Sequence, residues 1–495
     1  MNKPAQSPGP RPLALCVLLA LSIGLYLILI HVFPVGNDWT PLLSVWLISF
    51  LPYLAACVIV LATKPALGGW RWAELAIIFA GALVMRVLLL PLSPLLSHDS
   101  WRYVWDARVT LHGYSPYVYV PADPILSRLR DNLVFVQSRF RNAPTIYPPG
   151  AQAIFVLSYL LAPSNLFFLK GIFVGFDMVT CGALALLLIR KGLDPSRVLI
   201  YAWSPLPVVE FAIQGHLDAA TITFTVLAVL SAMSNRRGAR ALTGFLIGMA
   251  TLTKIYPILL LVAVARRREW TLKQPALLLT CFATIIAGYL PFYVLGHGQV
   301  LGFFLTYAGE NTTNSGVVPQ VIYWLGKHFP LGLQLPTIVF VEHSVDLVML
   351  GGVALMVLVL RLRERISMEA AALALIGTTL AVSPHIFPWY TTALLPWVAV
   401  LAGRLWIGKR PSGKGLAVAM AWYFTCTVLV AYWNSLDWRI YYALVYDVVL
   451  LGLAVAVVAQ VRKVKAVSLV RGACTPLPPP EDPGTKSETL QEKRI

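Results

Sequence analysis

The residues best suited to chemistry lie in a polar stretch, residues 93–149, that interrupts an otherwise apolar chain. Asp99 follows an apolar run by a few residues, which places its carboxylate near the lipid headgroups. An Asp there can take the hydroxyl proton of an acceptor while a lipid tail stays in the bilayer. We interpret Asp99 as a general base. The alternative is that Asp99 caps a helix that begins near Trp101, and the two interpretations are compatible.

Two cations are candidates for binding a phosphate. Arg102 lies three residues after Asp99, and a guanidinium suits an oxyanion. The alternative for Arg102 is a solvated ion-pair ladder with Asp106 on one helix face. Lys254 lies between two apolar stretches without an acidic neighbour in sequence. An ionisable residue at this depth indicates function, and the alternative is a lysine that snorkels to the interface.

Three further polar segments contain candidate binding residues. His216 and Asp218 lie in Gln-Gly-His-Leu-Asp, which is either a sugar or phosphate site or an ordinary polar turn. His385 lies among prolines and aromatic residues, which indicates either a broken helix at a cavity or an aromatic belt. Tyr147 begins Tyr-Pro-Pro-Gly, which is either part of the site or a simple helix start.

The composition excludes a water-soluble domain. The 495 residues are 58% hydrophobic and 12% charged, with a formal net charge of +17 and a mean hydropathy of +0.73. Repeated apolar runs of about 17–25 residues are typical of transmembrane helices. Most Lys and Arg residues lie in short clusters between these runs, as in cytoplasmic loops and unlike a nucleic-acid groove. The six cysteines are scattered without a metal-type spacing, so we expect no metal and no cofactor.

These patterns predict an all-α polytopic membrane protein with about 13–14 transmembrane segments. We expect a cytoplasmic N-terminus over residues 1–12, a transmembrane domain over 13–465, and a disordered cytoplasmic tail over 466–495. Residues 93–149 form a first extracytoplasmic loop with interfacial helices. For residues 147–190 we expect one net crossing, with the segment after the paired prolines re-entrant or on the outer face.

The alternation of basic clusters also predicts which polar groups share a membrane face. The segments around Asp99, His216, Lys254 and His385 all fall on the outer face. Arg86, near the outer end of its helix, is interpreted as snorkelling. Three acids within apolar runs are expected to pair internally: Asp177, Glu210 and Asp346.

The motifs together resemble a known family. After Asp99 come Arg-Tyr-x-Trp-Asp at 102–106 and Gly-x-x-Pro-Tyr at 113–117. Tyr-Pro-Pro-Gly, Gly-His-x-Asp, Lys-x-Tyr-Pro and Pro-His-x-x-Pro-Trp-Tyr follow. This order is similar to that of the bacterial polyprenol-phosphate-mannose-dependent mannosyltransferases, which are GT-C type enzymes near glycosyltransferase family 87. The resemblance covers about residues 73–433, and residues 99–117 are its most specific part.

The resemblance implies an inverting transfer of a hexose, commonly mannose, from a polyprenyl-phosphate donor to a lipid or glycan acceptor. It implies a multi-pass protein of the inner (plasma) membrane with its site on the extracytoplasmic face. The family's loop acid maps onto Asp99 as base, and its basic residues map onto Arg102 and Lys254. Relatives often carry two adjacent acids at the loop start, whereas this chain has His98 first. That departure disfavours a metal-bound site, and cations alone can stabilise a leaving phosphate.

Two other classes of protein remain as alternatives. A flippase or transporter of lipid-linked saccharides predicts buried charges along a through-pathway and internal repeat symmetry. An oligosaccharide ligase or polymerase predicts its key cations in a late, large outer loop. The polar groups here gather on one face, and the later outer loop, residues 297–334, is poor in charge. Both observations favour the glycosyltransferase.

Overall fold

The computed structural model describes residues 10–33, 38–65, 68–267, 274–308, 315–328, 335–407, 410–433 and 436–473. Nearly all of this part of the chain is helical. The one strand pairing within it joins β1 (Trp406–Ile407) and β2 (Arg410–Pro411), which run antiparallel. The predicted all-α class is confirmed.

Among the described residues, eight apolar helical segments are long enough to cross a membrane, so this is a multi-pass membrane protein. A 20-residue helix is about 30 Å long, which matches the hydrocarbon core of a bilayer. The eight segments are α1 (Pro10–His31), α2 with α3 (Thr40–Ile48 and Phe50–Ala62), α4 (Gly69–Leu89), α8 (Leu166–Arg190), α14 (Gln274–Leu295), α17 (Leu335–Leu362), α21 with η6 (Gly413–Thr427 and Val428–Tyr432), and α22 with α23 (Trp438–Tyr442 and Val448–Ala473).

The other helices are shorter or broken, which is why full-length spans number fewer than the 13–14 expected segments. Four apolar helices have 10–17 residues: α7 (Pro149–Leu161), α11 (Asp218–Ala232), α12 (Ala239–Thr253) and α18 (Met368–Ala381). Shorter pieces are α9 (Leu199–Ala202), α10 (Pro205–Ala212), α13 (Leu260–Ala263), α19 (Pro388–Thr391) and α20 (Leu395–Leu401). A further helix, α16 (Val317–His328), has 12 residues. Proline begins α10 and α19, where its missing N–H group leaves no hydrogen bond unmade.

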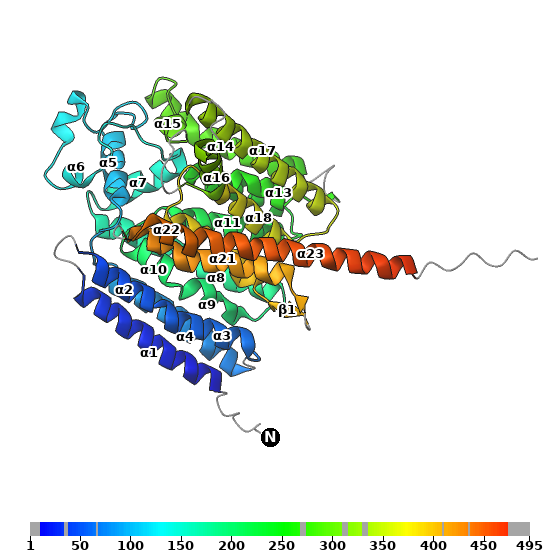
Figure 1. Cartoon of the computed structure of the whole chain (residues 1–495). Coiled ribbons are helices and arrows are strands. Elements are labelled where there is room, and N and C mark those ends of the chain that lie inside the picture. The colour runs from blue at the N-terminus through cyan, green and yellow to red at the C-terminus, as the bar shows by residue number, and fades with distance from the viewer. Residues whose placement is uncertain are drawn as a thin grey trace, which may run out of the picture.

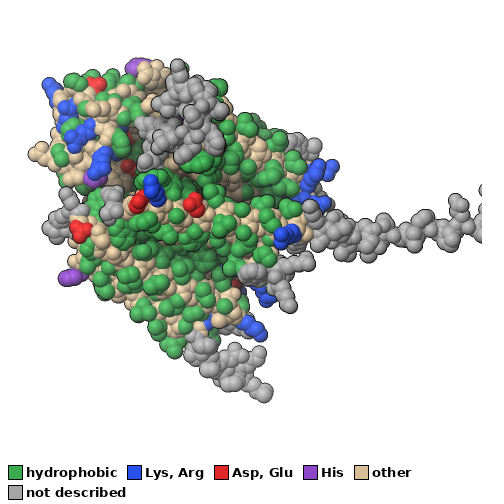
Figure 2. Space-filling view, in the orientation of Figure 1, with side chains coloured by type: hydrophobic (Ala, Val, Ile, Leu, Met, Phe, Trp, Pro, Cys, Tyr) green, Lys and Arg blue, Asp and Glu red, His purple; other side chains and the backbone are tan. Residues whose placement is uncertain are grey.

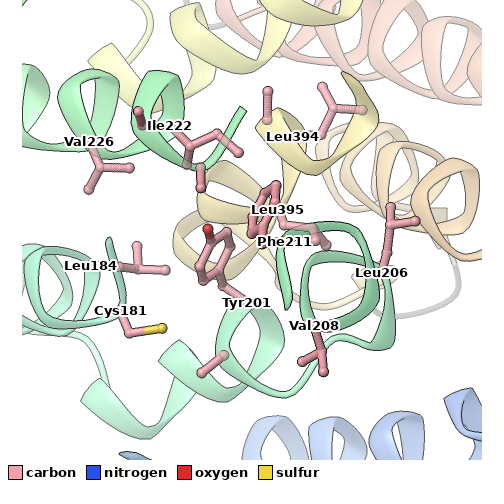
Figure 3. Close-up of a cluster of buried hydrophobic side chains, with 14 of the residues drawn as sticks. Cys181, Leu184, Tyr201, Leu206, Val208, Phe211, Ile222, Val226, Leu394 and Leu395 are labelled. Carbon is pink, nitrogen blue, oxygen red and sulfur yellow. The ribbon is translucent and has the colours of Figure 1, made fainter. Parts of the chain in front are cut away.

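Helices α8, α9, α10 and α11 lie in the middle of the view in Figure 1, with other helices around them. In Figure 1, α1–α4 form one flank, α14 and α17 form another, and α21–α23 run across the face toward the viewer. Figure 3 shows the buried core between them, where Leu184 of α8, Phe211 of α10, Ile222 of α11 and Leu394 point toward one another. This core supports the turn between α10 and α11 that carries the candidate residues.

Charged side chains mark the two ends of the bundle. At one end, Arg11 contacts Glu74 at 2.8 Å and Asp194 at 2.7 Å. Lys191, at the adjacent C-terminal end of α8, pairs with Glu369 at 2.8 Å. Figure 2 shows hydrophobic side chains covering the flank of the bundle, with Lys and Arg gathered over the region of α5 (Asp99–Leu111) and α6 (Val134–Gln137) and again at the far end.

Helix α8 runs between these two ends. Near its start, Lys170 donates hydrogen bonds to the carbonyls of Leu90 and Leu92, just beyond α4, at 2.7 and 2.5 Å. Its last residue, Arg190, lies at the opposite end of the bundle beside Lys191. α7 packs against α5 instead and has only 13 residues. The arrangement is consistent with one net crossing over residues 147–190.

Two expectations require correction. The snorkelling of Arg86 is wrong, because this side chain is fully buried and forms an ion pair with Asp177, which is also fully buried. Arg86 also donates to the carbonyls of Ala82 and Ala202 at 3.0 and 2.8 Å. The tail was expected from residue 466, whereas α23 continues to Ala473. Residues 1–9 and 474–495, with the rest of the expected tail, lie outside the described residues.

Candidate functional site

Helix α5 (Asp99–Leu111) lies in the polar segment 93–149, and Asp99 is the first residue of this helix. His98 occupies the N-cap position, and no side chain caps this helix. The backbone N–H of Asp99 donates to Ser97 Oγ at 3.2 Å, so the carboxylate itself is not used for capping. The capping interpretation of Asp99 is therefore wrong, and its carboxylate is available for other contacts.

The Asp99 carboxylate lies mostly out of water among other polar groups. Its side chain is 26% exposed, and Oδ2 lies 3.9 Å from Nδ1 of His216. Burial raises the pKa of Asp99 from 3.8 to about 6, although the charge of Lys254 and a hydrogen bond from Tyr147 oppose this rise. A carboxyl group with such a pKa is ionised at neutral pH and remains a stronger base than an ordinary aspartate.

The turn between α10 and α11 is attached to the loop that leads to Asp99. Gln214 Oε1 accepts hydrogen bonds from the backbone N–H groups of Leu95, Leu96 and Ser97 at 3.1, 3.1 and 3.2 Å. The next residue, Gly215, has φ +71°, and a Cβ there would lie 2.7 Å from Lys170 Cγ. Glycine is required at this position because a side chain meets both strain and overlap. The turn thereby presents His216 to Asp99.

Lys254 and Asp218 form a buried ion pair at the same place. Asp218 begins α11, and Lys254 ends α12 as its C-cap residue. Lys254 Nζ lies 2.6 Å from Asp218 Oδ1 and 3.7 Å from the centre of the Tyr390 ring. The Lys254 side chain is 18% exposed, so its ammonium does not snorkel into water. Its charge also acts on Asp99, which places both residues in one electrostatic cluster.

His216 is fully buried between two carboxylates. Its Nδ1 faces Asp99, and its Nε2 lies 3.3 Å from Glu210 Oε2. The imidazole stacks on Trp389, with ring centres 3.8 Å apart and planes 12° apart. Glu210 Oε1 accepts a hydrogen bond from the Tyr432 hydroxyl at 3.0 Å. Residues from α5, α10, α19 and η6 thus surround one imidazole.

His385 joins the site through aromatic rings. Its Nε2 lies 3.1 Å from the Tyr307 carbonyl oxygen, and its ring stacks on Tyr307 with centres 4.2 Å apart. The Tyr307 hydroxyl is 2.9 Å from that of Tyr390, whose ring contacts Lys254. His385 therefore forms part of an aromatic wall of the site and does not touch Asp99 in the described contacts.

Tyr147 is also at the site. Its hydrogen bond to Asp99 favours the ionised carboxylate. The ring packs edge-on against Tyr103 with centres 4.8 Å apart, and its backbone carbonyl accepts from the Tyr117 hydroxyl at 2.7 Å. Tyr147 thus attaches the start of α7 to α5, and its role is more than that of a helix start.

Arg102 has other partners than these residues in its described contacts, and its binding of a donor phosphate stays a prediction. Its Nε donates to Asp106 at 2.7 Å, and its other nitrogens donate to the carbonyls of Phe140 and Ala143 at 3.0 Å each. Arg102 is 7% exposed. The solvated ion-pair ladder is wrong, because Asp106 is buried as well. Arg102 fastens the loop segment 140–143 to α5, and three of its five N–H groups are used in these contacts.

An open groove of about 920 Å³ lies beside the start of α5. It is lined by residues 136–143 together with His98 and Phe303. Arg139 and Arg141 give the groove a positive character, and its described lining residues include no acid. His98, the residue before Asp99, lies in the wall of this groove.

Sequence reasoning missed the direct contacts of Trp389, Tyr390 and Gln214 with the candidate residues. Trp389 and Tyr390 belong to the aromatic segment around His385. The sequence did not distinguish an aromatic belt from a broken helix at a cavity for this segment. Glu210 was expected to pair internally, and its partners are Tyr432 and His216. The sequence signal that could have placed Glu210 at the site is its position within an apolar run, six residues before His216. Among the described residues, no group of three His, Cys, Asp or Glu side chains is placed to hold a metal ion.

Comparisons with known proteins show a similarity to one family over the middle of the chain. Residues 145–384 match the model of Glycosyltransferase family 87, a region that contains Tyr147, His216, Asp218 and Lys254. Asp99 precedes the matched region, and His385 follows it by one residue. A comparison with curated proteins gives no match.

Among solved structures, the chain is similar to ArnT from Cupriavidus metallidurans bound to undecaprenyl phosphate. The identity is 17%, the TM-score is 0.42, and the similarity covers 82% of this chain and 73% of that chain. So low a similarity supports no statement about the site. Residues 145–384 are thus similar to glycosyltransferases of family 87, and the described part of the chain contains eight apolar helical segments long enough to span a membrane.

Proposed function

We propose that this enzyme transfers a hexose, mannose in the first instance, from a polyprenyl-phosphate donor to a hydroxyl of an extracytoplasmic lipid or glycan acceptor. The configuration at the anomeric carbon is inverted. The observation that carries the proposal is the meeting of Asp99, His216, Asp218 and Lys254. These residues come from α5, the turn before α11, α11 itself and the end of α12, yet they form one cluster.

Each group has a role in the proposed reaction. Asp99 accepts the proton of the acceptor hydroxyl as that oxygen attacks the anomeric carbon. Lys254 stabilises the leaving polyprenyl phosphate, because a preorganised ammonium acts strongly where water is excluded. Asp218 holds Lys254 in place at 2.6 Å. Tyr147, His216 and His385 shape the sugar-binding side, with the rings of Trp389 and Tyr390 as its wall.

The direct test is the transfer of labelled mannose from polyprenyl-phosphate mannose by membranes that contain the protein. We expect transfer with the native chain and a fall of about 10²- to 10⁴-fold with Asp99→Asn, the usual contribution of a general base. Polyprenyl-phosphate glucose serves as the matched donor that tests the choice of sugar. A native rate of mannose transfer by Asp99→Asn would show that Asp99 is not the general base.

The alternative function, a flippase of lipid-linked saccharides, is tested with the same protein in sealed liposomes. It predicts movement of the labelled donor to the opposite leaflet without cleavage of the sugar–phosphate bond. If the protein is the proposed enzyme, the sugar–phosphate bond is cleaved when acceptor is present. Sugar transfer then does not require movement of the donor to the opposite leaflet. Donor movement without sugar transfer would refute the proposal.

A further inference from the structure

The groove beside the start of α5 has the size of a ligand site. Its volume of about 920 Å³ lies within the usual range for such sites, about 300–1,000 Å³. Its lining consists of the loop segment 136–143, of Phe303 just before α15 (Phe304–Ala308), and of His98. Because His98 directly precedes Asp99 in the chain, the lining begins one residue from the proposed base.

Hydrogen bonds hold the two sides of this groove in place. Arg102, in the first turn of α5, donates to the carbonyls of Phe140 and Ala143 at 3.0 Å each. On the other side, the backbone N–H of Phe303 donates to the carbonyl of Thr145 at 3.2 Å. The groove is therefore fixed to the turn of α5 that carries the proposed base, although its parts come from distant segments of the chain.

Phe140 supplies an exposed aromatic ring to the lining of the groove. The residue is 72% exposed, and its φ of +56° lies in the left-handed region, which a bulky side chain rarely adopts. Arg102 and the N–H of Ala143 hold this conformation by donating to the Phe140 carbonyl at 3.0 and 3.1 Å. A ligand that covers the ring removes its apolar surface from water, and the apolar face of a sugar ring suits this purpose.

Arginines give the groove its positive charge. Segment 128–143 contains four arginines and one acid, Asp131, which is paired with an arginine of α5. Arg141 is attached to its own loop, because its Nε donates to the Ser138 carbonyl at 3.1 Å. Arg139 is exposed, and no hydrogen bond or ion pair joins it to another residue that the structure describes. Its guanidinium is therefore available to an oxyanion.

His98 adds little charge of its own to the groove. Partial burial and the positive charge of Arg139 lower the pKa of His98 below its ordinary value of 6.5. The imidazole is therefore neutral at neutral pH, and the arginines carry the positive charge. This effect of Arg139 on His98 also shows that the charge of Arg139 is felt one residue from Asp99.

We propose that this groove binds the acceptor, and that the acceptor is a saccharide with an oxyanion group. The inference rests on the proposed function, because it requires Asp99 as the base. A sugar ring packs on Phe140, the oxyanion pairs with Arg139, and the attacking hydroxyl reaches Asp99 beside His98. A neutral sugar leaves Arg139 without a use, and a simple anion leaves the Phe140 ring uncovered, so both features together indicate a charged saccharide.

The first test compares two probes that differ in charge: octyl dimannoside, and the same dimannoside joined to octanol through a phosphodiester. Dissociation constants are measured with the purified full-length protein in detergent. We expect the anionic probe to bind about three- to tenfold more tightly, and we expect high salt to reduce this difference. Equal dissociation constants overturn the proposal. Displacement of the anionic probe by an equal concentration of phosphatidylglycerol also overturns it, because the groove would then recognise a lipid headgroup.

The second test uses exposed positions, where a substitution leaves the fold intact. Arg139→Gln should raise the dissociation constant of the anionic probe about three- to tenfold and leave that of the neutral probe within about twofold. Phe140→Ala should raise both constants about five- to tenfold. The matched controls are Arg128→Gln and Leu133→Ala, which change exposed side chains of the same loop outside the groove, and both constants should stay unchanged. An equal effect of Arg128→Gln and Arg139→Gln overturns the assignment to the groove.

Mannose transfer to the same probes separates this inference from the proposed function. Asp99→Asn should bind both probes as the native protein does and transfer mannose to neither. Probe binding with the expected preference, but without transfer by the native protein, removes the proposed function and the acceptor role with it. Transfer to both probes with equal acceptor KM removes only the charged groove and leaves the proposed function standing.

Discussion

Replacement of Asp99 by Asn is expected to destroy activity and to stabilise the folded protein at the same time. Burial raises the pKa of Asp99 from 3.8 to about 6. A group whose folded pKa is raised stabilises the protein fully below its unfolded pKa, and this contribution is lost as pH rises through the folded pKa. At pH 7.5 the ionised carboxylate thus lowers the free energy of unfolding, and an uncharged amide at this position removes that destabilisation.

The expected magnitude follows from the size of the shift. A difference of about 2 pKa units corresponds to about 3 kcal/mol at 25 °C, and this is an upper value because the side chain is partly solvated. We expect Asp99→Asn to raise the free energy of unfolding by about 1–3 kcal/mol at pH 7.5 and by much less at pH 4. Reversible unfolding in mixed detergent and SDS micelles measures this difference at both pH values.

The matched control is Asp106→Asn, the same chemical change two turns along α5. Asp106 is buried against Arg102 at 2.7 Å and accepts from Gln152 at 3.2 Å. Removal of its charge leaves a buried guanidinium unpaired, which typically costs about 3–5 kcal/mol. The two variants should therefore change stability in opposite directions. Equal destabilisation by both, or a gain for Asp99→Asn that is as large at pH 4 as at pH 7.5, would refute the electrostatic account of Asp99.

Three further predictions follow from the same cluster. Because the base must be ionised, kcat/KM should fall about tenfold per pH unit below an apparent pKa of about 6, and a flat profile from pH 5 to 8 would exclude Asp99 as the base. Lys254→Met should lower stability by leaving Asp218 unpaired, and the double variant with Asp218→Asn should recover stability but not donor affinity, as measured by unfolding and by donor KM. Gly215→Ala should abolish transfer while the protein remains in the membrane, because its Cβ would meet Lys170 at 2.7 Å; near-normal kcat would show that the turn tolerates a side chain.

The sequence alone determined the class of the protein and most of its membrane segments. Long apolar runs leave few options in a bilayer, because every backbone polar group must be satisfied within a helix. This is why α1, α4, α8 and α14 form helices long enough to cross a membrane, as repeated apolar runs predict. The same logic singled out Asp99, His216 and Lys254, because an ionisable group next to lipid is costly unless it has a use.

Only the tertiary structure decided which of these groups meet and what each one does. Arg102 and Lys254 looked alike in sequence as cations near the outer face, yet Arg102 bonds to Asp106 and two loop carbonyls, whereas Lys254 reaches Asp218 and Tyr390. The sequence does not distinguish Glu210 from other acids in apolar runs. In the structure, the turn at Gly215 places His216 Nε2 3.3 Å from Glu210 Oε2. The sequence shows which charged residues lie in apolar runs, where burial of a charge is unfavourable. The partner that offsets this cost comes from a helix far along the chain, and packing alone determines which helix that is.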